Sequence, residues 1–286
     1  MNQEFSKLKN HFHHSLSAIY DEREIDALFY GYLDEKWGVK KHIISMGDFS
    51  LNDDIQDDVQ RVLARLMQKE PLQYILQQTS FYGLPFHVTP SVLIPRPETE
   101  ELVDLIIKEN GDRKDLHILD IGTGSGAIAI ALSKNLIHCH IDALDCSLDA
   151  LQIAKQNADN LQVAAHFFLF DLLKETQTDF PYPWDIIVSN PPYIPLSHQQ
   201  FLHDNVVKYE PATALFVPDE DPLLFYRKIV AFATHHLIHQ GLLYFETHED
   251  FHAEIASLLA ENGYADIRSL KDINGKDRMI GCRKKE

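Results

Sequence analysis

The stretch Trp184-Asp185-Ile186-Ile187-Val188-Ser189 runs directly into Asn190-Pro191-Pro192-Tyr193, and the rest of the chain is organised around it. The apolar run has the composition of a buried strand, and the two prolines end it because neither can donate to a sheet ladder. Proline also restricts the residue before it, so this loop is stiff and holds its Asn and Tyr side chains in place. These side chains predict a site for a flat group that carries an NH2, with a proline-rich strand exit without chemistry as the alternative.

The composition indicates an acidic protein with one large domain and one small domain. The 286 residues are 45% hydrophobic, and 26 Lys and Arg against 43 Asp and Glu give a net charge of −17. Such a chain repels a nucleic-acid backbone unless it has a local basic patch. The densest basic run, Arg283-Lys284-Lys285, is expected to be a solvated tail.

Cysteine usage and hydropathy predict a cytoplasmic location. Three cysteines, Cys139, Cys146 and Cys282, are too few and too irregular for a disulfide framework or a zinc site, so no metal is expected. We find no signal-peptide pattern at the N-terminus and no apolar run of membrane-spanning length. We therefore expect a soluble, unexported protein without a membrane partner.

The hydrophobic pattern changes twice along the chain and predicts three parts. Residues 1–75 show helical periodicity, for example at Leu8, Phe12, Leu16 and Ile19, which predicts a small helical bundle. Residues 76–96 contain a glycine turn between apolar residues and are expected to form a β-hairpin linker. Residues 97–286 form the third part.

Short apolar runs alternate with helical stretches from residue 115 onward. Such alternation predicts an α/β fold with a mostly parallel, Rossmann-like sheet that is covered on both faces. Asn274-Gly275 between the last two runs predicts a terminal antiparallel hairpin. The expected parallel strands are 117–121, 141–145, 165–170, 184–189 and 242–245, with helices at 127–136 and 148–157.

A glycine-rich turn follows the first of these strands, in Asp120-Ile121-Gly122-Thr123-Gly124-Ser125-Gly126. Its glycines allow positive φ and close backbone approach, and the next helix directs free N–H groups at a ligand. The spacing is neither GxGxxG nor GxxxxGK[ST], so a dinucleotide or a triphosphate is not the first choice. Asp145, Asp171 and Asn190 follow successive strands, at the edge where open α/β sheets bind ligands.

Together these residues support a resemblance. The segment 120–126, Asp145 and the loop 190–193 resemble an S-adenosylmethionine-dependent class I methyltransferase that acts on a planar amino nitrogen, a group that includes DNA adenine methyltransferases. The flanking segments are similar to the protein-glutamine methyltransferase family that modifies peptide chain release factors. The match is specific from about residue 70 to the C-terminus and looser before it. The segments that carry it are 70–75, 92–100, 209–211, 214–215 and 272–278.

The resemblance implies methyl transfer from S-adenosyl-L-methionine to the glutamine side-chain nitrogen in the Gly-Gly-Gln motif of class 1 release factors. Asn190, Pro191 and Tyr193 are implied as catalytic, and Asn190, Pro191, Pro192 and Tyr193 as substrate-binding. The implied cofactor-binding residues are Gly122, Thr123, Gly124, Ser125, Gly126, Asp145, Asp171, Leu172, Asn190, Arg96 and Thr99.

Alternatives to this activity and to the role of the bundle stay open. The protein could be an amino methyltransferase of DNA or RNA bases, or a nucleotide-binding interaction module without activity. The bundle is expected to dock the release factor, or else to cover apolar surface of the catalytic part. We expect a monomer that does not contact nucleic acid directly.

The sequence differs from the family pattern at two places that do not include implied site residues. Gln77 takes the place of an expected glycine at the entry to the hairpin, and residues 217–222 replace a segment richer in glycine. The first concerns the turn into the hairpin, and the second concerns the conformation of a loop.

Overall fold

The computed structural model describes residues 3–46, 53–174, 180 and 182–285. The chain divides into two compact units, Met1–Gln78 with His203–Tyr209, and Thr79–Leu202 with Glu210–Glu286. Residues 79–96 therefore lie in the second unit. The predicted functional division at residues 75 and 96 remains a prediction.

The first unit is helical, as the periodicity predicted. Its long helices are α1 (Gln3–Leu16), α2 (Glu22–Trp37) and α4 (Asp53–Leu66), and α3 (Lys41–Met46) and α5 (Leu72–Leu76) are short. The expected apolar positions, such as Phe12, Phe29 and Val59, are buried in one cluster. Aromatic rings in this cluster pack around Phe29, whose ring centroid lies 5.1 Å from that of Phe12 and 5.5 Å from that of Phe5.

A helix from the middle of the chain, α9 (Asp204–Tyr209), belongs to this first unit. Lys69 forms an ion pair with Asp204, and the Tyr209 hydroxyl donates to the carbonyl oxygen of Gln68 at 2.9 Å. Sequence periodicity gave no indication of this packing, because α9 lies more than a hundred residues beyond the other helices of the unit.

The predicted hairpin is confirmed as β1 (Gln78–Phe81) and β2 (Leu84–His87). Tyr82 and Gly83 both have positive φ, 50° and 72°, which is the geometry of a tight two-residue hairpin turn. Phe81 and Phe86 are buried with ring centroids 6.0 Å apart, and both join the core of the second unit.

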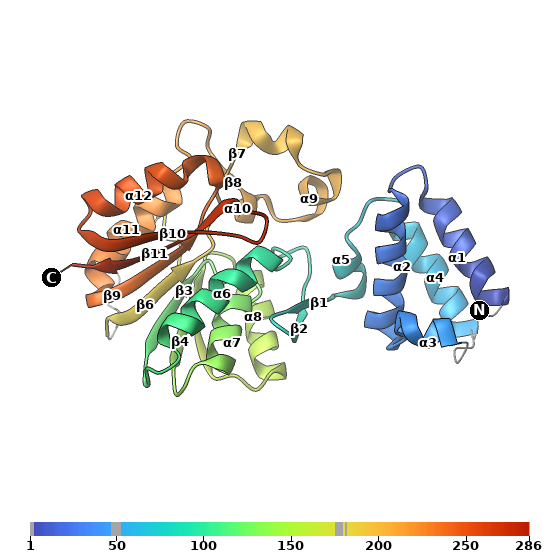
Figure 1. The fold of residues 1–286 in the computed structure, drawn as a ribbon, viewed down its shortest axis with the longest axis horizontal. Helices are drawn as coiled ribbons and strands as arrows, with labels where there is room; N and C mark the ends of the chain where they lie inside the picture. Colours follow the sequence, from blue (N-terminus) through green and yellow to red (C-terminus); the bar gives the residue numbers. More distant parts are fainter. Residues whose placement is uncertain (1–2, 47–52, 175–179, 181, 286) are drawn as a thin grey trace. The chain divides into compact units, whose positions relative to one another are not determined.

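The second unit contains a seven-stranded sheet, counted over the described residues, in the order β10-β11-β9-β6-β3-β4-β5 (Figure 1). Neighbours from β9 to β5 pair in parallel, whereas β11 pairs antiparallel with both β9 and β10. The predicted sheet and terminal hairpin are thus confirmed. The strands are β3 (His117–Ile121), β4 (His140–Asp145), β5 (Ala165–Leu169), β6 (Trp184–Ser189), β9 (Leu237–Glu246), β10 (Tyr264–Lys271) and β11 (Asp277–Lys284).

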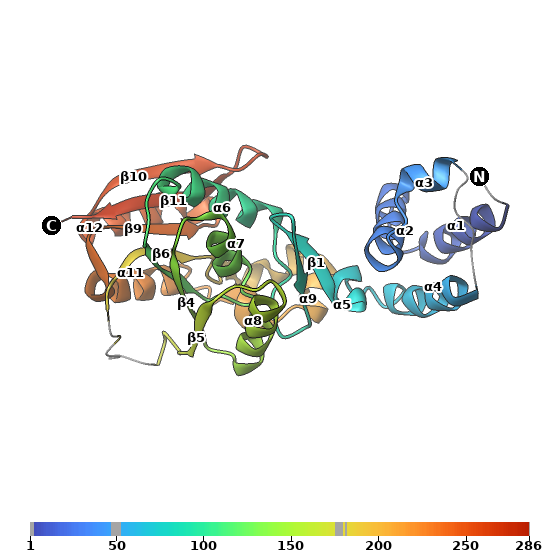
Figure 2. The same ribbon diagram turned by 90° about the horizontal axis from the view of Figure 1, so that it is seen from below.

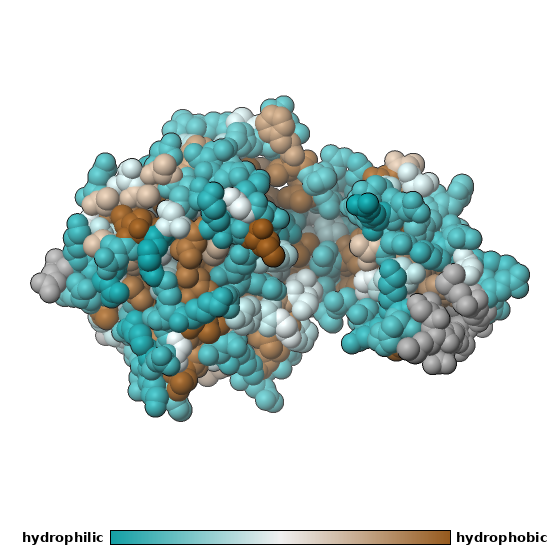
Figure 3. Space-filling model, in the orientation of Figure 1, coloured by the Kyte–Doolittle hydropathy of each residue, from teal (hydrophilic) through white to brown (hydrophobic). Residues whose placement is uncertain are grey.

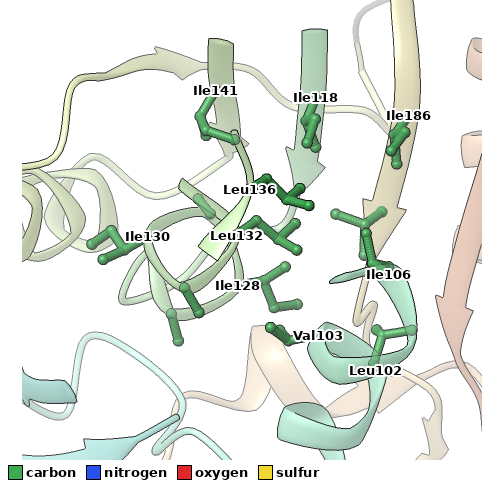
Figure 4. Close-up of a cluster of buried hydrophobic side chains, with 14 of the residues drawn as sticks. Leu102, Val103, Ile106, Ile118, Ile128, Ile130, Leu132, Leu136, Ile141 and Ile186 are labelled. Carbon is green, nitrogen blue, oxygen red and sulfur yellow. The ribbon is translucent and has the colours of Figure 1, made fainter. Parts of the chain in front are cut away.

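Helices cover both faces of this sheet (Figures 1 and 2). On one face α6 (Pro97–Asn110), α7 (Ala127–Asn135) and α8 (Leu148–Asn160) pack on Ile118, Ile186 and their neighbours (Figure 4). On the other, α11 (Leu224–His236) and α12 (His252–Glu261) pack on Leu119 and Ile187. Successive strand residues point to opposite faces, so a continuous apolar run supplies two cores.

Short elements complete the region after Tyr193. β7 (Ile194–Pro195) pairs in parallel with β8 (Phe216–Val217), and η1 (Leu196–Phe201), α10 (Ala212–Leu215) and η2 (Glu249–Phe251) are short helices. The departure at residues 217–222 has a defined structure, since the Asp219 carboxylate accepts the Ser197 N–H at 2.9 Å.

The basic run at the C-terminus corrects one expectation. Arg283 and Lys284 lie in β11 rather than in a solvated tail. Arg283 pairs with Asp266, and the Lys284 ammonium donates to two backbone carbonyls at 2.7 Å. All three cysteines are free thiols. Among the described helices, we find none long and apolar enough to cross a membrane.

Candidate active site

The register of the sheet brings the ends of four strands to one edge. Ile121 of β3 is opposite Leu144 of β4 and Ser189 of β6. Ser189 is in turn opposite Phe245 of β9. Because these strands are parallel, the residues that follow these positions lie at the same carboxyl edge. They are Gly122, Asp145, Asn190 and Glu246.

The glycine-rich turn leaves open space at this edge. The N–H groups of Gly122 and Thr123 both donate to the Leu144 carbonyl, at 2.9 and 3.0 Å. Gly122 and Gly124 have positive φ, and a Cβ atom on either would meet nothing within 4 Å. The turn therefore holds an exposed backbone surface against which a flat ligand can lie.

Gly126 has a different role in the same turn. Its φ is +81°, and an added Cβ would lie 3.1 Å from Ile130 Cδ1 and 3.3 Å from Ala154 Cβ. It caps the start of α7 and lets α7 and α8 pack closely. Ser125 is also buried, with its carbonyl accepting the Asn157 side-chain amide at 2.9 Å.

Asp145 holds the turn and keeps acceptor capacity for a ligand. Its Oδ2 accepts the Gly124 N–H and its Oδ1 accepts the Ser147 N–H, both at 2.9 Å. Burial raises the pKa of this carboxyl, while those N–H bonds act in the opposite direction. Each carboxylate oxygen has a second lone pair, which suits the hydroxyls of a ribose.

Asp171 and Leu172 follow β5 at the next position along the edge. The Asp171 carboxylate pairs with Lys174 at 2.7 Å and accepts the Leu173 N–H, and Lys174 holds the pKa of this carboxyl below its ordinary value. Leu172 packs against the core formed with α11 and α12. Their cofactor contacts remain predictions.

Asp120 is a buried carboxylate that our sequence analysis did not assign to the site. It is fully buried, and its Oδ2 accepts the Thr123 hydroxyl at 2.7 Å and the Ala129 N–H at 3.3 Å. Its Oδ1 has no hydrogen-bond partner among the described residues. Burial raises the pKa of Asp120 to about 7.

The Asn190 loop is held by one buried carboxylate, Glu246 at the end of β9. Asn190 Nδ2 donates to Thr99 Oγ1 at 3.1 Å, and Thr99 Oγ1 donates to Glu246 Oε2 at 2.6 Å. The Tyr193 hydroxyl donates to Glu246 Oε1 at 2.9 Å. Glu246 is 1% exposed, so these bonds replace its contact with water.

Electrostatics in this cluster follow from burial. Burial raises the pKa of Glu246, and the bonds from Thr99 and Tyr193 together with the positive charge of Arg278 oppose that change. Burial and the nearby carboxylate raise the pKa of Tyr193 far above its ordinary value. The phenol therefore keeps its proton at neutral pH and does not act as a base.

The remaining two predicted residues, Arg96 and Thr99, make protein contacts. The Arg96 guanidinium donates to Glu210 Oε1 at 2.6 Å, and Glu210 is almost fully buried. The Thr99 hydroxyl is shared between Asn190 and Glu246. Direct contact of either residue with the cofactor remains a prediction.

One group of potential metal ligands lies beside the Tyr193 ring in the described part of the chain. The ligand atoms of His198, His248 and Asp250 lie within 4.8 Å of one another. Burial lowers the pKa of His248, and its Nδ1 accepts the Asp250 N–H at 3.2 Å, so one ring nitrogen is already in use. The expectation of no metal remains a prediction.

These features fit S-adenosylmethionine. Open backbone at Gly122 and Gly124 leaves room for the nucleoside, and Asp145 can accept its ribose hydroxyls. Residues 99–209 match the family model described as Methyltransferase small domain.

The chain is 44% identical over 281 residues to the release factor glutamine methyltransferase of Flavobacterium psychrophilum, covering 95% of this chain and 96% of that protein. The chain belongs to the release factor glutamine methyltransferase family. The release factor glutamine methyltransferase of Bacteroides thetaiotaomicron is 42% identical to this chain over 281 residues, covering 96% of this chain and 98% of that protein. The predicted family and the S-adenosylmethionine-dependent methyltransferase activity are confirmed.

Solved structures agree at the level of fold. A methyltransferase of Pyrococcus furiosus aligns with a TM-score of 0.53 at 18% identity, over 78% of this chain and 98% of that one. The class I methyltransferase fold of this enzyme is thereby confirmed.

Glu246 and Asp120 are the site residues that sequence analysis missed. Glu246 directly follows the predicted strand 242–245, so the strand-end rule that selected Asp145 also applies to it. Asp120 is an acid inside an apolar strand next to the glycine turn, a position that is costly unless it has a function.

Proposed function

We propose that this enzyme transfers a methyl group from S-adenosylmethionine to the side-chain amide nitrogen of the glutamine in the Gly-Gly-Gln motif of class 1 release factors. The observation that carries the proposal is the rigid Asn190 loop, whose carboxamide donates its N–H to Thr99 and so directs Oδ1 the other way. The names of its relatives supply the substrate class.

The chain's own residues position a poor nucleophile. An amide nitrogen is weakly nucleophilic because its lone pair is delocalised into the carbonyl. Asn190 Oδ1 and the Pro191 carbonyl accept its two N–H groups, and the Tyr193 ring packs on the carboxamide face. The bound cofactor supplies the methyl group on a sulfonium sulfur. Pro192 keeps the loop stiff, which maintains the attack geometry.

Incubation with labelled cofactor and a purified release factor tests the proposal. We expect label on the Gly-Gly-Gln glutamine and none on a factor in which that glutamine is replaced by glutamate. Asn190→Ala should lower the rate by about 100-fold or more while cofactor affinity changes less. Absence of label on the factor, with label on DNA or RNA instead, would reject the proposal in favour of a nucleic-acid methyltransferase.

We further propose that the enzyme works as a monomer in the cytoplasm and does not bind nucleic acid directly. The net charge of −17 disfavours phosphate contacts, and the cytoplasm is where release factors act. The face in Figure 3 is mainly hydrophilic, with apolar residues in separate patches. Sedimentation analysis tests the monomer, and a salt titration of DNA binding tests the absence of phosphate contacts.

A further inference from the structure

The number of protons available determines which group donates and which accepts in the hydrogen bonds around Glu246. An ionised carboxylate only accepts, so the single hydroxyl proton of Thr99 goes to Glu246 Oε2. Thr99 Oγ1 can then only accept from Asn190, and the group that donates to it must be Nδ2. The acceptor end of the carboxamide, Oδ1, consequently faces away from Thr99.

The reverse orientation of Asn190 conflicts with this network. If Oδ1 faced Thr99, two acceptors would meet, because the hydroxyl proton is already given to the carboxylate. An unsatisfied buried acceptor costs about 1–3 kcal/mol, which is enough to leave one orientation dominant. Thr99 and Glu246 are both buried, at 5% and 1% exposure, so water cannot readily supply the missing bond.

We propose that Glu246 is a positioning residue that sets, through the Thr99 hydroxyl, which end of the Asn190 carboxamide faces the substrate. This rests on the proposed function, in which Asn190 Oδ1 accepts an N–H of the substrate amide. Glu246 never touches the substrate in this scheme. It also fixes the other side of the site, because it accepts the Tyr193 hydroxyl.

Glu246→Gln is the sharpest variant because it keeps the shape and changes the direction of the bonds. In the native enzyme the Tyr193 hydroxyl donates to Glu246, and in the variant the new amide oxygen accepts the same proton. The new amide NH2 then donates to Thr99 Oγ1. The freed Thr99 proton goes to Asn190 Oδ1, and Nδ2 is turned toward the substrate. The Thr99, Tyr193 and Asn190 groups keep their bonds within the network, but the site now presents a donor to another donor.

Thr99 offers a matched pair of variants. Thr99→Val removes the hydroxyl with nearly the same shape, and Thr99→Ser keeps it. At saturating cofactor we expect Thr99→Val and Glu246→Gln to lower kcat by about 100-fold, and Thr99→Ser to stay within about 3-fold. Because both losses arise from one relay, adding Glu246→Gln to Thr99→Val should cost less than about 3-fold more. Cofactor affinity should change little in Glu246→Gln, because Glu246 is not among the predicted cofactor-binding residues.

Full activity of folded Thr99→Val or Glu246→Gln overturns the proposal. So does a multiplicative loss in the double variant, or an equal loss in Thr99→Ser and Thr99→Val, since either result indicates a packing role. If Glu246→Gln does not fold, the Ser and Val variants at Thr99 decide the question.

A readout without substrate separates this inference from the proposed function. The side-chain amide protons of Asn190, assigned in ¹⁵N spectra by their loss in Asn190→Ala, should exchange slowly with solvent in the native enzyme and in Thr99→Ser. They should exchange faster in Thr99→Val. Unchanged exchange overturns the relay, whereas slow exchange in an enzyme that labels no release factor rejects only the proposed substrate.

Discussion

Carboxylates at the carboxyl edge of the sheet differ in what surrounds them, and that difference separates their roles. Asp145 is bonded to two backbone N–H groups, Glu246 to two hydroxyls, and Asp120 has one oxygen without a partner in the described chain. Asp145 holds the glycine turn, Glu246 bonds two side chains of the Asn190 site, and Asp120 is enclosed by protein next to the glycine turn. Residue type alone does not distinguish them.

Asp145→Ala should weaken S-adenosylmethionine binding. Loss of charge-assisted bonds to the ribose hydroxyls is expected to cost about 1.5–3 kcal/mol, or about 10- to 150-fold in Kd. Titration calorimetry measures the Kd of S-adenosylmethionine directly. Asp145→Asn is the matched control, because it retains one acceptor oxygen and should lose less. If both variants bind S-adenosylmethionine as tightly as the native enzyme, Asp145 serves only the turn.

Asp120 should make stability depend on pH. Burial raises its pKa from 3.8 to about 7 in the folded protein, so its contribution to stability is full below the unfolded pKa and is lost as pH rises toward 7. Between pH 4 and 7 the stability of Asp120→Asn should therefore rise relative to wild type, by up to about 1.4 kcal/mol per pH unit. Urea unfolding without cofactor at pH 5, 6 and 7 measures the difference. If the free energies of unfolding of wild type and Asp120→Asn change equally with pH, Asp120 does not have the raised pKa.

At the scale of elements, the junction between α5 and β1 explains the departure at Gln77. Gln77 ends α5 in the left-handed conformation, with φ of 54°, and its N–H donates back to Gln73 and Tyr74 carbonyls. This is the conformation that glycine adopts most readily at a helix end. The chain therefore keeps the turn of the family pattern with a less suitable residue.

Gln77→Gly should stabilise the enzyme by about 1 kcal/mol, because it removes the steric cost of a left-handed side-chain residue. Thermal or urea unfolding measures it. Gly38→Ala is the matched reverse test, since Gly38 caps α2 at φ of 65° and an added Cβ meets no atom within 4 Å. That variant should lose a similar amount. A destabilised Gln77→Gly would indicate that the exposed glutamine side chain contributes bonds of its own.

At the scale of the whole molecule, the two compact units do not follow the chain order. Residues 203–209 come after the Asn190 loop, yet they pack in the unit formed by the N-terminal helices. Within this unit, Gln68 and Lys69 of the N-terminal part are bonded to Tyr209 and Asp204, which belong to the segment 203–209 that lies 10 to 16 residues beyond Tyr193 in the chain.

Deleting residues 1–75 should separate substrate docking from chemistry. If the helical part docks the release factor, the shortened enzyme binds cofactor and methylates a short glutamine peptide nearly normally but methylates the intact factor poorly. The ratio of kcat/KM for the two substrates measures this. An equal loss on both substrates, or an insoluble protein, favours a structural role. Tyr209→Phe is a milder companion variant, because it removes only the bond to Gln68.

The sequence by itself determined the order of elements and the identity of the glycine turn and the Asn190 loop. Short apolar runs and helical periodicities are local patterns, so runs such as 184–189 and 117–121 specify strands before any partner is known. The strand-end rule then selected Gly122, Asp145 and Asn190, because parallel strands place their ends together. At Gln77 the family resemblance indicated only a missing glycine, and the left-handed conformation of this residue came from the structure.

Only the tertiary structure decided which of these groups are bonded to one another. Thr99, Asn190 and Glu246 are separated by 91 and 56 positions in the chain, and no local pattern relates them. Their contact follows from sheet register and from the docking of α6, which place a hydroxyl between a carboxylate and an amide. The same holds for α9, whose short sequence does not reveal which core it joins. Burial, which moves the pKa values of Asp120 and Glu246, exists only once the chain has folded around them.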